Sequence, residues 1–358
     1  MANTMSSFLG GNTPCGFVSF FDELYNPYEK HRALIIKGGP GTGKSGIMKT
    51  VAKKAEEKGY STEYIYCASD PKSLDGVIIP ELKLAIADGT SPHVIEPVFP
   101  GAAEKIINTG DCWDDQKLFS KGDEIRRLTL ENSLHHRRSS AYLSAAGKLK
   151  EENSRAIDPF INREKIYSYA LRFVNRELPE ISKTPGRKKR RFLSAVTPEG
   201  KVFLSDSVKK QAHRIIGVED EFSDCAALLI DRIGELAVKR GYDVYFCYCP
   251  MSPKGECEHI IIPSASLALI SEKSTHNTNL EYDRVLHSRR FLYEGTEKHK
   301  KRLSLNRRLQ NELLNESIEC LKKAKQVHDD LEKIYIDAMD FDTLGKTAQK
   351  IVSDFVGS

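Results

Sequence analysis

The feature that most constrains the fold of this chain is a glycine-rich loop that follows a short apolar run. Residues Ala33 to Ser45 read ALIIKGGPGTGKS, so Gly38, four loop residues, Gly43, Lys44 and Ser45 complete the pattern of a P-loop, or Walker A motif. The glycines allow a tight turn whose backbone N–H groups surround phosphate oxygens, and the next helix points its positive end at the same place. The pattern therefore predicts a strand, a phosphate-binding loop and a helix in that order.

Each loop residue is a candidate for contact with a nucleotide, and the predicted set is Gly38, Gly39, Pro40, Gly41, Thr42, Gly43, Lys44 and Ser45. We expect the Lys44 ammonium to reach the outer phosphates and the Ser45 hydroxyl to bind Mg²⁺. The chain has no Asn-Lys-x-Asp motif that would read a guanine base. The predicted ligands are therefore ATP and Mg²⁺.

The second half of the chain repeats the motifs of the first half in the same order, with gaps of one or two residues, which indicates a duplicated domain. The matched segments are Phe8-Leu9 with Phe192-Leu193, Lys58-Gly59-Tyr60 with Arg240-Gly241-Tyr242, Ile78-Ile79-Pro80 with Ile261-Ile262-Pro263, and His93 with His276.

The repeat aligns the P-loop with residues 220–227, which read DEFSDCAA. In that copy Asp220 replaces Gly38, and Ala226 replaces Lys44. A carboxylate then stands where phosphate would bind, and the cation is absent. We expect the second copy to keep the fold and to have lost its nucleotide site.

Short apolar runs that alternate with helical patterns predict the α/β class. The expected architecture is two tandem P-loop NTPase-like three-layer α/β/α domains with parallel sheets, each followed by a helical segment. The predicted domains are residues 1–186 and 187–358. In the first we expect strands at 33–37, 61–67 and 84–87 and a helix at 44–58. The helical segments, near 143–160 and 314–338, are expected to pack on a sheet or on each other.

A P-loop needs a carboxylate that holds the Mg²⁺ shell, usually at the end of a neighbouring strand. Asp88 ends the apolar run from Leu84 and is replaced by Ser271 in the second copy, so it is the first candidate for this role. Asp70 and Asp75 follow the preceding strand and are alternatives for the metal or for the attacking water. A turn-opening role for Asp70, which precedes a proline, stays open. We therefore predict catalytic roles for Lys44, Asp88, Asp75 and Asp70, and Mg²⁺ ligation by Ser45 and Asp88.

Three further groups have both a functional and a structural interpretation. Cys247, Cys249, Cys257 and His259 have ligand types that zinc accepts, but their spacing matches no common zinc motif, so a structural role is preferred. The basic runs 187–191 and 135–138 fit either a phosphate-rich partner or a charged linker and a solvated helix face. Arginines at 126, 127, 137 and 138 are candidates for a lid over a phosphoryl acceptor.

Composition narrows the class of protein. The 358 residues carry a net charge of only +4, which does not indicate a nucleic-acid binder, and there is neither a secretory signal pattern nor an apolar run of the length that a membrane helix needs. Eight scattered cysteines beside a P-loop fit a reducing cytoplasm. A protein partner or a homo-oligomer stays open.

The stretches FLGGNTPCGF, IKGGPGTGKS and CASDPKSLDGVIIPEL resemble a bacterial family of tandem P-loop proteins described as ATPases or ATP-binding proteins. The resemblance spans nearly the whole chain and is strongest from residue 8 to residue 113. It implies two P-loop domains, and this chain departs from the family in the second P-loop. Three functions follow as expectations: an ATPase, a small-molecule or nucleotide kinase, and a nucleotide-gated binding protein without useful turnover.

Overall fold

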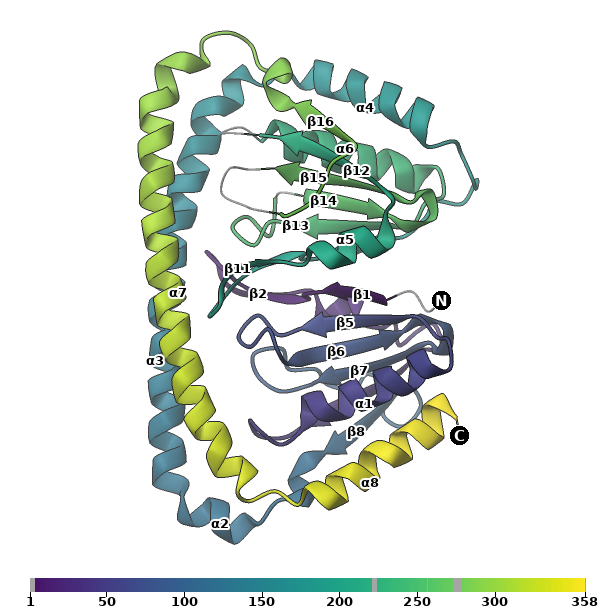
Figure 1. Ribbon diagram of the computed structural model, residues 1–358, viewed down its shortest axis with the longest axis vertical. Helices are drawn as coiled ribbons and strands as arrows, with labels where there is room; N and C mark the ends of the chain where they lie inside the picture. The colour runs from purple at the N-terminus through teal and green to yellow at the C-terminus, as the bar shows by residue number, and fades with distance from the viewer. Residues whose placement is uncertain (1–3, 221–223, 256, 273–277, 358) are drawn as a thin grey trace.

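The computed structural model describes residues 4–220, 224–255, 257–272 and 278–357. Two six-stranded sheets form its two α/β domains (Figure 1). The first sheet has, in spatial order, the strands β1 (Thr4–Ser7), β5 (Thr62–Tyr66), β6 (Leu74–Ile79), β7 (Leu84–Asp88), β4 (Arg32–Lys37) and β8 (Glu104–Asn108).

The second sheet has the same order of corresponding strands. It consists of β9 (Lys188–Arg191), β13 (Val244–Tyr248), β14 (Cys257–Ile262), β15 (Leu267–Glu272), β12 (Arg214–Glu219) and β16 (Arg284–His287).

Both sheets are mostly parallel, as the sequence predicts, but each contains one antiparallel strand. β6 runs antiparallel to β5 and β7, and β14 runs antiparallel to β13 and β15. No strand is predicted from the sequence between 61–67 and 84–87, where β6 lies. The apolar run LDGVII instead follows a tight turn at Asp70 and folds back as a hairpin beside β5.

One face of the first sheet packs against α1 (Lys44–Glu57) and against α8 (Phe341–Ile351), which comes from the end of the chain. The segment from Phe8 to Leu24 covers the other face, including part of the hairpin β2 (Gly10–Thr13) and β3 (Gly16–Ser19) and the 3-10 helix η1 (Phe21–Glu23). In the described residues this layer contains no α-helix.

The second sheet lies between helices on both faces. The helices α4 (Arg163–Glu177) and α6 (Cys225–Lys239) cover one face. The other face packs against α5 (Ser205–Gln211) and the end of β11 (Gly200–Phe203), which pairs with β10 (Ser194–Thr197).

Two long helices, α3 (Gly122–Ile157) and α7 (Lys300–Ile336), pack side by side in opposite directions and span both domains (Figure 1). The predicted helical segments therefore pack on each other. The helices that follow them then cross over: α4 follows α3 but packs on the second sheet, and α8 follows α7 but packs on the first. The predicted boundary at residue 186 thus divides the sequence, but each sheet takes a helix from the other part.

Contacts between the halves are reciprocal. Phe8 and Phe192 exchange two backbone N–H···O hydrogen bonds of 2.9 Å, and these two residues are partners in the sequence repeat. At the middle of the long helices the hydroxyls of Ser139 and Ser317 lie 2.8 Å apart. Similar halves that meet through the same surface give contacts of this kind. The two domains are therefore arranged around an approximate two-fold axis.

The remaining elements are short connections. They are η2 (Pro80–Leu82), η3 (Thr109–Cys112), α2 (Asp115–Ser120), η4 (Asp158–Phe160), η5 (Pro263–Ala265), η6 (Ser288–Phe291), η7 (Thr296–His299) and the π-helical turn η8 (Val352–Val356). None of the helices in the described part of the chain has the length and apolar character to cross a membrane.

Candidate functional site

The P-loop connects β4 to α1, as the sequence predicts. Gly41 and Gly43 have φ angles of +68° and +80°, which favour glycine. Gly43 is the N-cap of α1 and has no side chain to cap the helix, so the first N–H groups of α1 depend on another acceptor. Phosphate oxygens are suited to that role.

The Thr42 side chain fixes the loop from the inside. Its hydroxyl donates a 2.9 Å hydrogen bond to the Gly39 carbonyl and accepts one of 2.9 Å from Thr109, whose hydroxyl also contacts the Lys37 carbonyl. A Cβ atom at Gly38 would lie 1.8 Å from the Thr109 hydroxyl, so only glycine fits there. The loop is therefore held in a turn of fixed shape.

Lys44 and Asp88 meet at the end of the strand beside the P-loop. The Lys44 Nζ donates to the carbonyls of Gly39 (2.6 Å) and Gly38 (3.3 Å) and lies 3.5 Å from Asp88 Oδ2. The other Asp88 oxygen accepts hydrogen bonds from the N–H and hydroxyl of Thr90. Asp88 therefore stands where a carboxylate can hold a P-loop metal shell.

Ser45 lies in the first turn of α1 and lines the same cavity as Lys44. Its hydroxyl oxygen accepts a 3.0 Å hydrogen bond from the N–H of Leu74, at the start of β6. The Ser45 oxygen keeps a second lone pair, so the residues present fit an Mg²⁺ shell shared with Asp88.

Asp75 lies opposite Asp88, because β6 and β7 are antiparallel and pair Gly76 with Ala87. The Asp75 side chain is buried, and burial raises the pKa of its carboxyl to about 6; His93 lowers this pKa and the Asp88 charge raises it. A carboxyl with this pKa can accept a proton near neutral pH.

The residue that accompanies Asp75 is His93, which the sequence analysis used only to mark the repeat. Its Nε2 lies 3.7 Å from Asp75 Oδ1, and its ring stacks on Phe21 with the centroids 4.4 Å apart. His93 is 7% exposed, and its Nδ1 has no hydrogen-bond partner in the structure. Its repeat partner, His276, lies outside the described residues.

Asp70 lines the cavity but also shapes its own turn. Its carboxylate accepts hydrogen bonds from the Ser73 hydroxyl and from the Lys72 N–H, which is the turn-opening interaction considered in the sequence analysis. The same carboxylate lies 3.7 Å from the ammonium of Lys325, on α7. Asp70 therefore links the strand end to the long helix.

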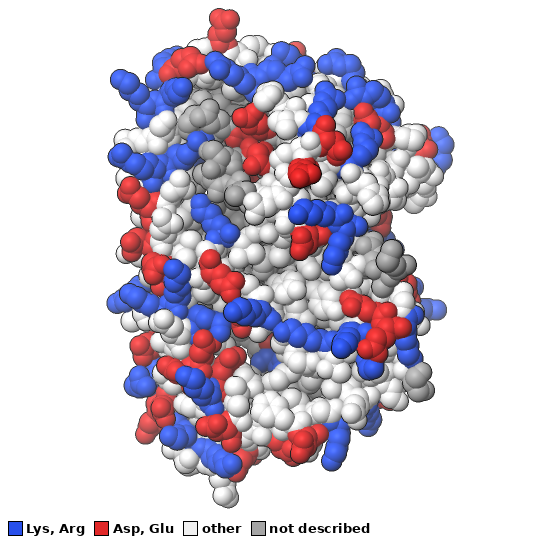
Figure 2. All heavy atoms as spheres, in the orientation of Figure 1, with Lys and Arg blue, Asp and Glu red and all other residues white. Residues whose placement is uncertain are grey.

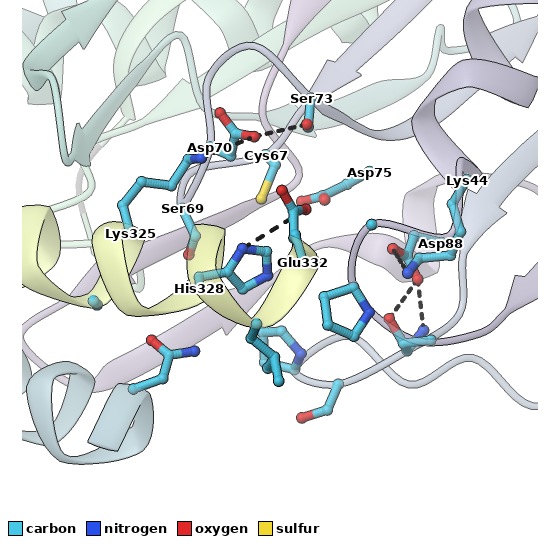
Figure 3. A pocket seen from close by; sticks show the side chains of 18 of the residues that line it. Lys44, Cys67, Ser69, Asp70, Ser73, Asp75, Asp88, Lys325, His328 and Glu332 are labelled. Atoms are coloured by element: carbon cyan, nitrogen blue, oxygen red, sulfur yellow. Dashed lines mark hydrogen bonds and ion pairs between the residues drawn. The ribbon is translucent and has the colours of Figure 1, made fainter. Parts of the chain in front are cut away.

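The helices α3 and α7 close a cavity of about 870 Å³ over the P-loop. In Figure 3, Lys325, His328 and Glu332 of α7 reach toward Asp70 and Asp75. The α3 side of the cavity is polar and consists of Thr129, Asn132, Ser133, His136 and Ser140, which share one helix face.

The second half of the chain also contacts the P-loop directly. A Cβ atom at Gly39 would lie 2.5 Å from the Tyr335 ring, one at Gly41 would lie 2.9 Å from the Glu332 carbonyl oxygen, and one at Gly43 would lie 2.4 Å from Leu344. These α7 and α8 residues were missed in the sequence analysis. No local motif marks them, since they reach the site only because the long helix returns to the first domain.

The predicted arginine lid is not at the cavity. Arg126 and Arg127 are exposed and pair with Asp123 and Glu131 on their own helix, and none of the described cavity-lining residues is an arginine. The cations that line it are Lys44 and Lys325. Of these two cations, Lys325 on α7 is the one in a position to act as the lid cation that was predicted to be an arginine.

The basic run 187–191 has a structural role. It includes strand β9, and Arg191 forms a buried bidentate ion pair with Glu63 of the first sheet (2.5 and 2.9 Å). Burial disfavours both charges, but each stabilises the other, so the pKa of Glu63 is lowered and that of Arg191 raised. Figure 2 shows acidic and basic residues interspersed on the visible face, without a single-sign patch.

The second domain presents a different group at the matching helix. Asp220 is buried, and its Oδ2 accepts a 2.8 Å hydrogen bond from the Ala226 N–H at the start of α6. The intervening residues 221–223 lie outside the described part. Ser271 is buried and donates its N–H to His259 Nδ1.

The cysteine and histidine group of the second domain is divided between two cores. Cys247 packs in the cluster on the α5 face, whereas Cys257 packs in the cluster on the α6 face. Among the described residues, ligand atoms of this set do not come together as a metal-binding group, whereas those of His328, Asp329 and Glu332 lie within 4.8 Å of one another. Cys247 and Cys257 therefore lie on opposite faces of the second sheet, and the structural role of this group stays a prediction.

Comparisons with known proteins bear on the first domain. Residues 18–87 match a family model described as Novel STAND NTPase 3, and the match includes the P-loop, Asp70 and Asp75. No curated protein and no solved structure matches the chain. Over this segment the chain is similar to an NTPase family of the P-loop type, which supports nucleotide binding.

Proposed function

We propose that this protein binds ATP at residues 38–45 and hydrolyses it with Mg²⁺. The observation that carries the proposal is the 3.5 Å distance between Lys44 Nζ and Asp88 Oδ2. The two groups lie beside a helix N-terminus that has no side-chain cap. A phosphate chain needs these three features: a cation, a metal-binding carboxylate and free N–H groups. The similarity of residues 18–87 to an NTPase family supports the same assignment.

The residues have separate roles in this proposal. Lys44 would exchange its loop carbonyls for the outer phosphate oxygens, and Ser45 and Asp88 would hold the Mg²⁺ shell. That ion would neutralise charge on the phosphates. Asp75 takes the proton of the attacking water, because it is buried beside Asp88 with a pKa of about 6. Asp70 acts indirectly, by holding Lys325 at the cavity wall.

The second domain has a structural or regulatory role in this account. The Asp220 carboxylate occupies the start of α6, where a phosphate would otherwise bind, so we propose one nucleotide per chain. The helices α7 and α8 then couple this domain to the first P-loop, because both contact its glycines. The duplication inferred from the sequence is supported by the common strand order.

The test is ATP turnover by the pure protein, with ADP and inorganic phosphate measured separately. Hydrolysis releases both in equal amounts, and Lys44→Ala and Asp88→Ala should each lower the rate at least 100-fold. An exposed-lysine variant, Lys105→Ala, is the control. Equal turnover by Lys44→Ala and the unchanged protein would contradict the proposal.

A small-molecule or nucleotide kinase is the second candidate, and one observation favours it. The cavity extends beyond the P-loop to a polar wall on α3, with room for an acceptor besides a triphosphate. A kinase would form ADP without equivalent phosphate release when a metabolite pool is added. A nucleotide-gated binding protein, the third candidate, would bind ATP tightly with no turnover that Lys44→Ala could remove.

A further inference from the structure

One turn of α7 carries three side chains of metal-ligating type. His328, Asp329 and Glu332 each offer one nitrogen or oxygen atom, and these atoms all lie within 4.8 Å of one another. His328 and Glu332 are four residues apart, so they share a helix face, and both line the cavity over the P-loop. Figure 3 shows the two side chains beside each other, with the carboxylate toward the centre of the cavity.

The His328 ring is positioned like that of a metal ligand in the absence of its metal. Its Nδ1 is buried and has no hydrogen-bond partner in the structure. The nearest carboxylate oxygen, Oε1 of Glu332, lies 3.7 Å away, which is too long for a hydrogen bond. Metal bonds of about 2.0–2.2 Å at a tetrahedral angle hold two donor atoms about 3.4 Å apart. A metal ion therefore fits between these atoms with a small side-chain movement.

Charge around this turn favours a cation. Lys325 pairs with Asp329 and lies 3.7 Å from Asp70, and its ammonium is close enough to feel the charges of Asp70, Asp329 and Glu332. Three negative groups against one positive group leave a net charge of −2, which one divalent ion neutralises. The charges are partly removed from water by the cavity walls, and there such an imbalance costs more than at an open surface.

We propose that His328, Asp329 and Glu332 bind one divalent transition-metal ion of the zinc class. The ligand types favour such an ion over a second Mg²⁺, because an imidazole nitrogen with carboxylate oxygens suits Zn²⁺, whereas Mg²⁺ prefers oxygen donors in octahedral geometry. Three protein ligands leave at least one coordination position for water or for an anionic group in the cavity. This site is separate from the Mg²⁺ shell at Ser45 and Asp88.

The direct test is Zn²⁺ titration of the full chain after chelator treatment, by calorimetry and by competition with a chromophoric chelator. We expect one equivalent of Zn²⁺ per chain. His328→Ala and Glu332→Gln should each weaken binding at least 10-fold. His213→Ala, which removes an exposed histidine of the second domain, should not. Lys44→Ala should also keep the Zn²⁺ affinity, which separates this proposal from the nucleotide site.

A second measurement uses the unchanged protein, so it does not depend on the folding of variants. Diethyl pyrocarbonate modifies accessible imidazoles, and peptide mass analysis locates the modified residue. Zn²⁺ should protect His328 at least fivefold, whereas Mg²⁺ at the same concentration should not. Absence of Zn²⁺ binding, binding that survives both His328→Ala and Glu332→Gln, or equal protection by Mg²⁺ would overturn the proposal.

Discussion

The Asp220 carboxylate accepts a 2.8 Å hydrogen bond from the backbone N–H of Ala226, at the start of α6. In the first domain the corresponding helix, α1, begins at Lys44. Its N-cap residue is Gly43, which offers no side chain to accept a hydrogen bond from the helix. A carboxylate of the chain itself thus accepts a hydrogen bond from the N-terminus of α6. The N-terminal N–H groups of α1 have no such side-chain acceptor. The two domains share a strand order but differ in what they place at this helix end.

This difference predicts the nucleotide stoichiometry. A slowly hydrolysed ATP analogue should bind once per chain in calorimetry. Asp220→Ala removes the acceptor at α6 and should lower the free energy of unfolding by about 1–2 kcal/mol, because a buried helix N–H loses its partner. The stoichiometry should stay at one in that variant. Two equivalents bound to the unchanged chain would contradict the assignment of the second domain.

Asp75 predicts a pH dependence of stability. Its folded pKa of about 6 is above the ordinary value, so burial of the ionised carboxylate costs stability at high pH, and the cost disappears as pH falls below the unfolded pKa of about 4. Asp75→Asn should therefore be more stable than the unchanged protein by about 3 kcal/mol at pH 8. This gain should shrink between pH 7 and pH 4, as measured by urea unfolding.

The same titration bears on turnover, since a protonated Asp75 cannot accept a proton. The rate should fall as pH decreases through about 6. The His93 charge lowers this pKa, so His93→Gln should move the midpoint upward. A midpoint that does not change in His93→Gln would show that another group controls the pH profile.

The buried ion pair of Arg191 and Glu63 joins the two sheets, and its loss is expected to lower the free energy of unfolding. Arg191→Met leaves the Glu63 carboxylate buried without its partner, and we expect a loss of about 3–5 kcal/mol in the free energy of unfolding. The double variant with Glu63→Gln should recover at least half of that loss. A double variant no more stable than Arg191→Met would argue against this ion pair as the source of the effect.

The close approach of the Tyr335 ring to Gly39 allows the contact between α7 and the P-loop to be tested. A methyl group there would meet the Tyr335 ring at 2.5 Å, so Gly39→Ala should lower stability by about 1–3 kcal/mol and weaken ATP binding. Adding Tyr335→Ala removes the clash and should restore part of the affinity. If Gly39→Ala binds ATP with unchanged affinity, α7 does not restrict the loop in solution.

Much of the first domain could be predicted from the sequence because its signals are local. The P-loop, the strands that end at Lys37 and Asp88 and the helix from Lys44 occur where the sequence predicts them. The antiparallel strand β6 was missed, since the periodicity of a short apolar run does not by itself identify a strand.

The α7 wall could not be found in the same way. Lys325, His328 and Glu332 follow no catalytic motif and lie about 280 residues from the P-loop in sequence. They reach the cavity because α3 and α7 pack along their length and α8 returns to the first sheet. Contacts of this kind depend on how the two domains exchange helices, which sequence periodicity does not encode.

The central claim is that Lys44 and its loop bind the phosphates of Mg·ATP. The most direct measurement is the affinity of the full chain for Mg·ATP by calorimetry, with Lys44→Ala compared with the control Lys105→Ala. The account predicts that Lys44→Ala weakens binding at least 30-fold and that Lys105→Ala leaves it unchanged. Equal affinity in Lys44→Ala and the unchanged protein would contradict the account.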